Sequence, residues 1–552
     1  MTTREPTESE RRESRSEPKN RPGRAELLLP AGDLEKLKTA VLYGADAIYA
    51  GTPDLSLRSK SGFSVEALAE GVRFAHEHGK RVYLTLNLFT HNRDVERLEA
   101  SLEAFRAIRP DGVIVADLGV IEYLRERAPE LELHVSTQAN VLSYLTVNAW
   151  HRAGASLVVM AREVSFAELE EIRQRCPSVR LETFVHGAMC MTYSGRCLLS
   201  NYMAERGSNQ GSCAHSCRWK YSLKVKKADG SEGLLEITDE NMREFEFFLE
   251  EEFRPGQLYP IEEDERGSYI MNSRDLNLMP RLADYLRLGI DSLKVEGRNK
   301  SEYYLAVVGR AYRAAIDRYY QDPESFDATP FLAELMTVPN RGYTEGFFSG
   351  RLDQTGQNLT SSASLAYFEY AGVVRSVSPG DASSGGSLVL EIKNRLLAGD
   401  VLEFLLPNSI EVVRLRLYEF EAADTGLITE RVTAGESRAI RIPLAAFHAD
   451  GERVASSIVP GVVARKARPL EARDEAQLTQ DRRSFAVEQG LLPATALVSS
   501  LRAPLGGAKA PKLGALGCCG LGCNGCLPFW KDDRYQVARD KLAERSNGAR
   551  LC

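Results

Sequence analysis

The sequence predicts an α/β protein: a (β/α)8-like barrel, then a small antiparallel β-barrel domain and a cysteine-rich C-terminal tail. From Glu26 onward, short apolar segments alternate with amphipathic segments of about a dozen residues, which is typical of parallel βαβ units. Eight such units fit into residues 26–325, as a closed barrel requires. After residue 366 the pattern changes to alternating apolar and polar positions separated by glycine turns, which predicts antiparallel strands.

The expected barrel strands follow one another along the chain. They are ELLLPAG, AIYAG, RVYLTLN, GVIVAD, LHVSTQ, LVVMAR, RLETFVHG and, much later, SLKVEG. Segments with helical periodicity follow them, such as DLEKLKTAVLYGA, SVEALAEGVRFAHEHG, DVERLEASLEAFRAI and SFAELEEIRQRC. A ninth candidate strand, YIMNS at Tyr269–Ser273, belongs either to an insertion or to a variant of the barrel.

The domain boundaries follow changes in composition. Residues 1–25 are charged and polar, which predicts a disordered leader, and the barrel at 26–325 carries a cysteine-rich insertion at 190–221. A connecting segment and the C-terminal β-barrel domain are expected at 326–460 and a linker at 461–512. The cysteine-rich tail with a short helix is expected at 513–552.

Composition also indicates the cellular compartment in which the protein is expected. No apolar run approaches the length of a membrane span, and the N-terminus lacks the apolar stretch of a secretory signal. We therefore expect a cytoplasmic protein with no membrane partner. Disulfides are rare in that reducing compartment, so clustered cysteines there more often hold a metal or do redox chemistry. With a net charge of −7, an RNA partner would need a local basic patch.

A first cysteine group occupies the segment after the seventh expected strand. Its members are Cys190, Cys197, Cys213 and Cys217, in the spacing C-x6-C-x15-C-x3-C. Four thiolates can hold zinc or a 4Fe–4S cluster. Zinc ribbons favour C-x2-C pairs, which this group lacks, so its spacing fits a cluster better. Buried free cysteines, or one nucleophilic cysteine assisted by His186 or His215, are the alternatives.

Polar residues end most of the expected strands. In a (β/α)8 barrel the active site lies at the carboxyl ends of the strands. Those ends here carry Asn87, Asp117, Gln138, Arg162, His186 and Glu296. His186 and Glu296 are the candidate catalytic residues, although polar residues also end strands for structural reasons. The cysteine group follows FVHG directly and is therefore expected at the same face.

Basic residues near these positions are candidates for substrate binding. In CRWKY the cations could meet phosphates and the aromatic rings could stack on unpaired bases, although an amphipathic strand explains the same pattern equally well. The candidates are Arg218, Trp219, Lys220, Tyr221, Arg274, Lys294, Arg298 and Lys300. The last three surround Glu296 and could bind phosphate or the carboxylates of a small acid. A salt bridge from Glu296 to Arg298 or Lys294 is the structural alternative.

Several long motifs resemble a known family. ETFVHGAMCMTYSGRCLLSNY, GSCAHSCRWKY, YIMNSRDLNLMP and SLKVEGRNKSEYYLAVVGRAYR are similar to the collagenase-like peptidases of the unassigned class, peptidase family U32. NQGSCAHSCRWKY and NRGYTEGFFSG are most similar to its tRNA hydroxylation branch, the TrhP type. The resemblance runs from Glu26 to Pro460.

The resemblance implies an activity and a cofactor. It implies an iron–sulfur-dependent tRNA modification enzyme that hydroxylates the wobble uridine to 5-hydroxyuridine, with prephenate implicated as a co-substrate and an electron donor unknown. It also implies that the first cysteine group holds a 4Fe–4S cluster. Because relatives hydroxylate ribosomal RNA or ubiquinone precursors, another RNA or a small aromatic is an alternative substrate.

Two rival functions come from other classes. The family name suggests peptidase activity on proteins, yet the chain contains no H-E-x-x-H and no G-x-S-x-G motif. A non-catalytic RNA-binding module is the second rival. The density of cysteines argues against both.

A second cysteine group lies near the end of the chain, in CCGLGCNGC. Its members are Cys518, Cys519, Cys523 and Cys526. From Cys519 the spacing is C-x3-C-x2-C, as in radical S-adenosylmethionine enzymes, but those carry the motif after the first strand of a barrel. A second iron–sulfur cluster or a zinc site is therefore the expectation. This tail lies outside the family resemblance, which leaves open whether the substrate is the usual one.

Overall fold

The structure is a computed structural model, which describes most of the chain between residues 23 and 469. The described residues are 23–51, 63–87, 90–190, 193, 273–350, 356, 364, 366–380, 385–434, 438–450 and 457–469, with the backbone of strands β8–β12. The barrel and the β domain belong to one compact unit, whereas residues 218–272, which contain β8–β12, belong to another. The second cysteine group, and the linker and tail after residue 469, lie outside the described residues.

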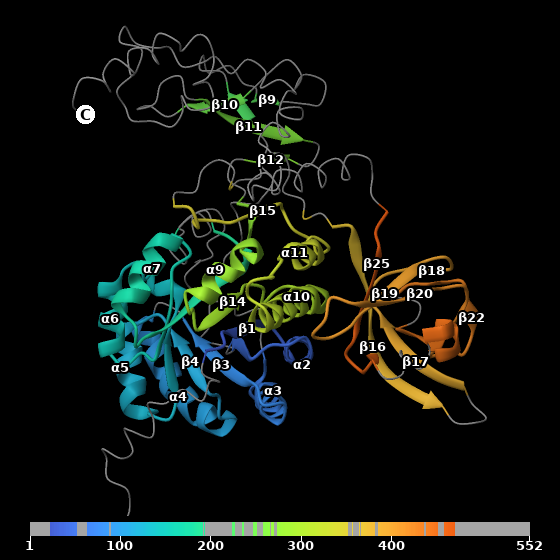
Figure 1. Cartoon of the computed structure of the whole chain (residues 1–552), viewed down its shortest axis with the longest axis horizontal. Helices are drawn as coiled ribbons and strands as arrows, with labels where there is room; N and C mark the ends of the chain where they lie inside the picture. Colours follow the sequence, from blue (N-terminus) through green and yellow to red (C-terminus); the bar gives the residue numbers. More distant parts are fainter. Residues whose placement is uncertain are drawn as a thin grey trace, which may run out of the picture. The chain divides into compact units, whose positions relative to one another are not determined.

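Eight parallel strands close into a ring, which confirms the predicted barrel (Figure 1). In ring order they are β1 Glu26–Ala31, β2 Ala47–Gly51, β3 Arg81–Leu86, β4 Gly112–Val115, β5 Glu132–Val135, β6 Leu157–Val159, β7 Arg180–Ala188 and β14 Ser292–Val295. Strand β14 closes the ring by pairing with both β1 and β7. Each of the eight lies in a segment that the sequence predicted as a strand.

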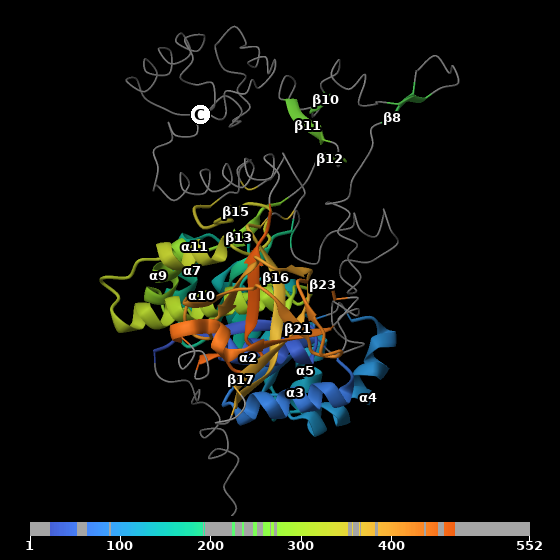
Figure 2. The same cartoon turned by 90° about the vertical axis from the view of Figure 1, so that its right-hand side faces the viewer.

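Amphipathic helices surround this ring, and α2 and α3 pack against each other on its outside (Figures 1 and 2). The helices are α2 Leu34–Leu42, α3 Val65–Glu77, α4 Asn92–Ile108, α5 Leu118–Arg127, α6 Tyr144–Arg152, α7 Phe166–Arg175, α9 Leu282–Arg287, α10 Glu302–Gln321 and α11 Thr329–Leu335. Outward side chains of the strands, such as Leu27 and Leu29, join helix residues such as Leu37 in the main core. Burial of these apolar side chains holds the helices against the barrel.

Strand β7 leaves the ring at its carboxyl end and pairs with a further strand. Residues His186–Ala188 pair antiparallel with β13, Asp275–Asn277, and β13 pairs parallel with β15, Tyr343–Thr344. Of the ninth candidate strand, Tyr269–Ser273, residues 270–272 lie outside the described residues. Tyr269 is the last residue of β12, Gly267–Tyr269, and the strand added to the ring's sheet begins at Asp275.

An antiparallel sheet forms the second domain, as predicted. Its order is β20-β19-β25-β16-β17-β24-β21-β22, and its inner side chains form a core of their own (Figure 2). The strands are β16 Phe368–Gly380, β17 Gly385–Ile392, β19 Val401–Leu405, β20 Val412–Arg416, β21 Phe420–Ala422, β22 Ile428–Thr429, β24 Ala439–Pro443 and β25 Val463–Ala467, with β18 Leu396–Leu397 and β23 Arg431–Val432 as a separate pair. Because β25 follows residue 460, the sheet extends into the segment expected to be a linker.

Buried arginines and glutamates join the barrel to this sheet; we call Arg310, Glu334, Glu403 and Arg465 the interface network. Arg310 of α10 is fully buried, and its Nη2 lies 2.5 Å from Oε1 of Glu334 in α11. Arg465 of β25 donates to Glu334 and to Glu403, at 2.9 Å each. A charge this deeply buried is tolerated because it is paired and hydrogen-bonded.

No helix among the described residues combines the length and the apolar character that crossing a membrane requires.

A candidate active site at the mouth of the barrel

Polar side chains gather at the carboxyl end of the barrel; we call Thr85, Arg162, Glu296 and Arg298 the mouth cluster. Arg162 Nη2 lies 3.4 Å from Glu296 Oε2, and Arg298 Nη1 donates to Thr85 Oγ1 at 2.9 Å. These residues follow β6 and β14 or end β3, so closure of the ring brings them together. The side chains of Arg162 and Glu296 are 8% and 14% exposed. Charges act strongly at such a site because little water screens them.

Aromatic and charged side chains lie below the mouth cluster, inside the barrel. The guanidinium of Arg162 is 3.9 Å from the ring centroid of Phe184. Lys294 of β14 precedes Glu296 by two residues. Its Nζ lies 2.7 Å from Glu182 Oε1 and 4.6 Å from the ring centroid of Tyr49. Lys294 is 5% exposed, so the structure places it inside the barrel. The sequence offered a salt bridge from Lys294 or Arg298 to Glu296 as the structural alternative, but Lys294 pairs with Glu182, and Glu296 pairs with Arg162.

Two buried acceptors beside the mouth cluster have no hydrogen-bond partner. They are Gln138 Oε1, after β5, and Glu163 Oε2, after β6. Burial also raises the pKa of Glu163. An unsatisfied buried polar atom costs about 1–3 kcal/mol, so such atoms mark places where a ligand or water completes the bonding.

His186, a candidate catalytic residue, faces tyrosines outside the ring. The register of β7 and β14 shifts between Lys294 and Val295, so His186 pairs with Val295. The imidazole lies near Tyr304, Tyr312 and Tyr343, with centroids 6.0, 5.7 and 5.4 Å away. Burial lowers the pKa of His186 to about 3, so the ring is neutral at physiological pH. Its catalytic role stays a prediction.

Gly187 fixes the distance between β7 and the residue after β14. Its φ is +114°, and a Cβ at this position would lie 2.5 Å from the carbonyl oxygen of Glu296. The amide of Glu296 donates to the carbonyl of His186 at 2.9 Å. Only glycine fits this backbone without strain, and the close approach holds Glu296 at the barrel wall.

The structure locates the other polar candidates in different settings. Asp117 accepts from the backbone amide of Gly119 and caps α5, a structural role. Arg274 donates its backbone amide to Gly356 at 3.0 Å, and Lys300 Nζ lies 5.3 Å from the ring centroid of Tyr304. The roles of Arg274, Lys294, Arg298 and Lys300 in substrate binding stay predictions.

Only the start of the first cysteine group is described. Cys190 is exposed and lies two residues beyond Ala188, the end of β7. Within the described ranges, no group of three or more histidine, cysteine or acidic side chains could hold a metal ion. Outside the described residues lie Cys197, Cys213, Cys217, Arg218, Trp219, Lys220 and Tyr221.

Sequence reasoning missed Glu182 and named Lys294 as a candidate for substrate binding, not as a residue of the barrel interior. Both lie within strands that are otherwise mostly apolar, RLETFVHG and SLKVEG. Opposite charges inside two buried strands are the signal that could have predicted their pairing. Thr85, at the end of RVYLTL, carries no comparable signal.

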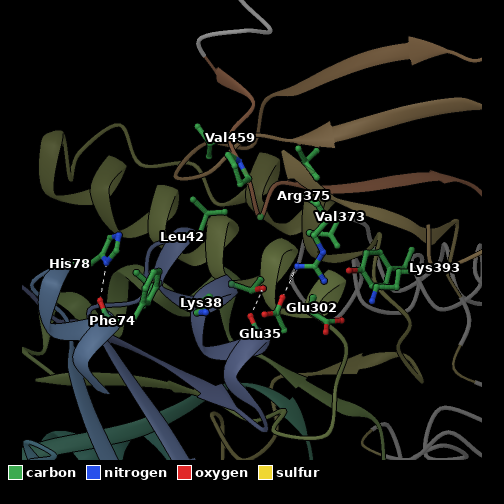
Figure 3. A pocket seen from close by; sticks show the side chains of 16 residues that line it. Glu35, Lys38, Leu42, Phe74, His78, Glu302, Val373, Arg375, Lys393 and Val459 are labelled. Carbon is green, nitrogen blue, oxygen red and sulfur yellow. Dashed lines mark hydrogen bonds and ion pairs between the residues drawn. The ribbon is translucent and has the colours of Figure 1, made fainter. Parts of the chain in front are cut away.

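A separate cavity of about 650 Å³ lies between helices α2 and α3 and strand β16 (Figure 3). Its lining includes Lys38, Arg375 and Lys393, and it shares no residue with the mouth cluster. Each of these cations is paired with a glutamate: Lys38 with Glu70 at 2.9 Å, Arg375 with Glu35 at 2.6 Å, and Lys393 with Glu391 at 2.8 Å. The mouth cluster lies at the carboxyl end of the barrel strands, where the active site of such a barrel is expected, and is therefore the better candidate for an active site.

A family model describes the part of the chain that forms this site. The model of peptidase family U32 matches residues 32–358, which begin directly after β1 and include the carboxyl ends of the other seven barrel strands. The chain belongs to peptidase family U32. This confirms the resemblance that the motifs predicted.

Proteins similar to this chain carry names that point to different activities. The tRNA hydroxylation protein P of Escherichia coli K12 is 38% identical over 398 residues, covering 69% of this chain and 86% of that protein. The 23S rRNA 5-hydroxycytidine C2501 synthase of the same organism is 28% identical over 340 residues, covering 60% of this chain and 46% of that protein. A collagenase of Porphyromonas gingivalis W83 is 27% identical over 425 residues, covering 73% and 92%.

Proposed function

We propose that this chain is an RNA-hydroxylating enzyme that converts the wobble uridine of tRNA to 5-hydroxyuridine. The observation that carries the proposal is its 38% identity to tRNA hydroxylation protein P over 69% of this chain. The relative named for a 5-hydroxycytidine in ribosomal RNA supports RNA as the substrate class. The proposed partner is therefore tRNA, met in the cytoplasm.

The mouth cluster suits a base that has been turned out of an RNA loop. Enzymes that modify a base draw it into a pocket and bind its edge with hydrogen bonds. The guanidinium groups of Arg162 and Arg298 can donate to the carbonyl oxygens of uracil, and the Glu296 carboxylate can accept from its N3–H. Buried charged groups bind such polar edges more strongly than exposed ones.

The reaction needs a second substrate. Replacing the hydrogen at C5 by a hydroxyl oxidises the base by two electrons, so an oxygen donor must bind as well. We assign this role to a small acid such as prephenate, whose carboxylates Arg298 and Lys300 can meet; another small-molecule hydroxyl donor is the alternative.

The first cysteine group is the proposed site of a 4Fe–4S cluster. Four thiolates are the usual ligands of such a cluster, and the described thiol, that of Cys190, is exposed at the carboxyl end of β7. A bound cluster would supply electron transfer or an exposed iron. The second group, Cys518 to Cys526, is proposed to hold another cluster or zinc.

Nucleoside mass spectrometry of tRNA tests the activity. A host strain without its own wobble hydroxylation would express the wild type, Arg162→Met, Cys213→Ala or Arg375→Ala. We expect 5-hydroxyuridine with the wild type and with Arg375→Ala, whose side chain lines the separate cavity. Arg162→Met and Cys213→Ala should leave uridine unmodified. Wild-type protein that is expressed and folded but forms no 5-hydroxyuridine would contradict the proposal.

Metal analysis tests the cofactor separately. Iron and acid-labile sulfide would be measured on anaerobically purified wild type and on a variant with Cys190, Cys197, Cys213 and Cys217 all changed to alanine. We expect about four irons per chain to be lost in the variant. Iron that survives in the variant would place a cluster in the tail instead.

Peptidase activity is the second candidate, because the collagenase of P. gingivalis matches 73% of this chain. Peptide hydrolysis needs a nucleophile with its base, a metal-bound water or a carboxylate pair. The mouth cluster contains no serine, cysteine or histidine, and one carboxylate. We expect purified protein to leave gelatin and denatured collagen intact, and their cleavage by the wild type but not by Arg162→Met would favour the peptidase.

A further inference from the structure

Two glutamates share one serine hydroxyl inside the barrel, at the end opposite the mouth. Glu26, Ser292 and Glu182 lie in one row across β1, β14 and β7. They are 4%, 1% and 0% exposed. Ser292 Oγ lies 2.8 Å from Glu182 Oε2 and 3.2 Å from Glu26 Oε1. No part of the proposed function uses this row.

The two contacts require a proton on one of the carboxyl groups. A hydroxyl has a single hydrogen, so Ser292 can donate to only one of the two glutamates. The other contact is a hydrogen bond only if that glutamate is protonated and donates to Ser292 Oγ. Two ionised carboxylates around one buried hydroxyl would also repel each other.

The charges around each carboxyl group indicate where the proton resides. Lys294 Nζ contacts Glu182 at 2.7 Å and favours its ionised form. The hydroxyl of Tyr83 donates to Glu26 at 3.1 Å, and Arg81 pairs with Glu26. Arg81 is partly exposed, with 24% of its side chain accessible, so its charge is better screened than that of Lys294, which is 6% accessible.

The remaining charges near Glu26 act in both directions. Burial raises the pKa of Glu26 to about 7, against the lowering effect of Arg81, while Glu182 and Asp46 raise it and Arg180 lowers it. Arg81 and Tyr83 both donate to Oε2 of Glu26, so Oε1, which faces Ser292, is the atom that can carry the proton. The pKa that burial raises favours the protonated form of Glu26 near neutral pH.

We propose that Glu26, Ser292 and Glu182 form a proton-holding unit that positions Lys294 below the mouth cluster. The Glu26 acid donates to Ser292, Ser292 donates to Glu182, and ionised Glu182 holds the Lys294 ammonium. If the Glu26 proton passes to Ser292 while the Ser292 proton passes to Glu182, only O–H bonds break and form. Glu26 is then ionised beside Arg81, and Lys294 faces a neutral acid.

The place of one proton thus decides the charge that faces Lys294, with no change in net charge. Glu26 and Ser292 are positioning residues in this unit, because they act on Lys294 through Glu182. The inference rests on the barrel interior alone and does not depend on which RNA the protein modifies.

Infrared spectroscopy of the full chain tests where the proton is. The difference spectrum between wild type and Glu26→Gln at pH 6 should contain a protonated-carboxyl C=O band that shifts in D2O. The band should disappear in the wild type at pH 9, and Ser292→Ala should change its frequency. If no protonated-carboxyl band of the wild type is lost between pH 6 and pH 9, the proposal is overturned. This comparison needs the wild type alone, so it holds even if Glu26→Gln fails to fold.

Glu132→Gln is the matched control, because Glu132 begins β5 at the same end of the barrel. Although burial acts to raise it, bonds from His134 and Arg180 lower the pKa of Glu132 to about 2. Its carboxylate is therefore ionised at pH 6, and its replacement should leave the band in place. If the band is lost in Glu132→Gln and kept in Glu26→Gln, the proton resides on Glu132. That result would refute the proposed unit.

The pH dependence of unfolding gives a second readout. The pKa of Glu26 is about 7 in the folded protein against 4.5 for the free side chain. Between these values the folded state holds a proton that the unfolded state has released, so stability falls as pH rises through this window and levels off above it. The folding constant of the wild type relative to Glu26→Gln should fall by about tenfold per pH unit there. A ratio independent of pH would refute the proposal.

Discussion

The interface network and the mouth cluster both contain buried arginines and glutamates, but their ion pairs differ in length. Arg310 uses all three guanidinium nitrogens, on Glu334 and on the carbonyl of Glu411. Its contact with Glu334 measures 2.5 Å, whereas Arg162 and Glu296 in the mouth cluster are 3.4 Å apart. A short pair whose guanidinium nitrogens are all used is typical of a structural joint, whereas the longer pair lies at the end of the barrel where an active site is expected.

The same contrast appears among the neighbours of each group. In the interface network, Arg465 bonds Glu334, Glu403 and the hydroxyl of Thr337. Beside the mouth cluster, Gln138 and Glu163 each keep a buried oxygen without a partner. Substitutions in the first group should therefore change stability, and those in the second should change activity.

The largest expected effect is that of Glu334→Ala in the interface network. This change removes the carboxylate that pairs with the buried side chains of Arg310 and Arg465. We expect the free energy of unfolding to fall by about 3–5 kcal/mol. Denaturant unfolding measures it. The control is Glu419→Ala, an exposed glutamate of the β domain, and its effect should stay within about 0.5 kcal/mol. Equal stability of Glu334→Ala and wild type would remove the contrast.

A backbone change next to the mouth cluster should have the next largest effect. Gly187→Ala places a Cβ 2.5 Å from the Glu296 carbonyl at a φ of +114°, and should lower the free energy of unfolding by roughly 1–3 kcal/mol. It should also lower 5-hydroxyuridine formation, because Glu296 must move.

Gly289→Ala is the control for Gly187→Ala, since its φ of +74° is also positive but nothing lies within 4 Å of the added Cβ. Denaturant unfolding should show a smaller loss, roughly 1 kcal/mol, with unchanged hydroxylation. Equal losses at the two glycines would show that the close approach to Glu296 is unimportant.

Arg162→Met tests the mouth cluster itself. Removing a charged group from the base edge should slow hydroxylation at least tenfold, which corresponds to about 1.4 kcal/mol, because the donor to uracil is lost. The rate would be measured on purified tRNA by nucleoside mass spectrometry. Arg162→Lys keeps the charge without the planar fork, so it should retain an intermediate rate. Should Arg162→Met unfold as easily as Glu334→Ala while keeping its rate, the mouth cluster would be structural too.

The smallest effect is expected for Arg375→Ala, at the separate cavity. Arg375 pairs with Glu35 across half-exposed side chains, 40% and 50% accessible, so water and salt screen the pair. The free energy of unfolding should fall by less than about 1 kcal/mol, and by less still at high salt. A loss as large as that of Glu334→Ala would show that exposed pairs also hold the two domains together.

The fold was predictable because burial leaves a clear pattern in the sequence. The barrel strands are buried on both sides, so they appear as short apolar runs between amphipathic helices. Strand β13 was not predicted because three residues, DLN, carry too little pattern to stand out. β25 was assigned to a linker because Arg465 and Lys466 make it look exposed, whereas the structure buries both in ion pairs.

The candidate site was predictable only in outline. The rule of polar strand ends singled out Arg162 and Glu296, which the structure brings together because parallel strands place their carboxyl ends at one face, and their role in a site stays a prediction. The pairing of Glu182 with Lys294 depends on β7 and β14 being neighbours, which follows only from closure of the ring. His186 faces outward because the register of β7 and β14 shifts there, and no residue type in the sequence indicates that shift.

The pairing of Ala188 with Asp275 has a consequence for the long stretch of chain between them. The stretch 189–274 begins and ends at residues that are held opposite each other by β7 and β13. The entropy needed to close a loop grows slowly with its length, by about 0.6 kcal/mol per doubling, so fixed ends tolerate very different contents. This pair therefore fixes the two points at which the stretch leaves and rejoins the sheet, and it lies beside the eight strands without being part of their ring.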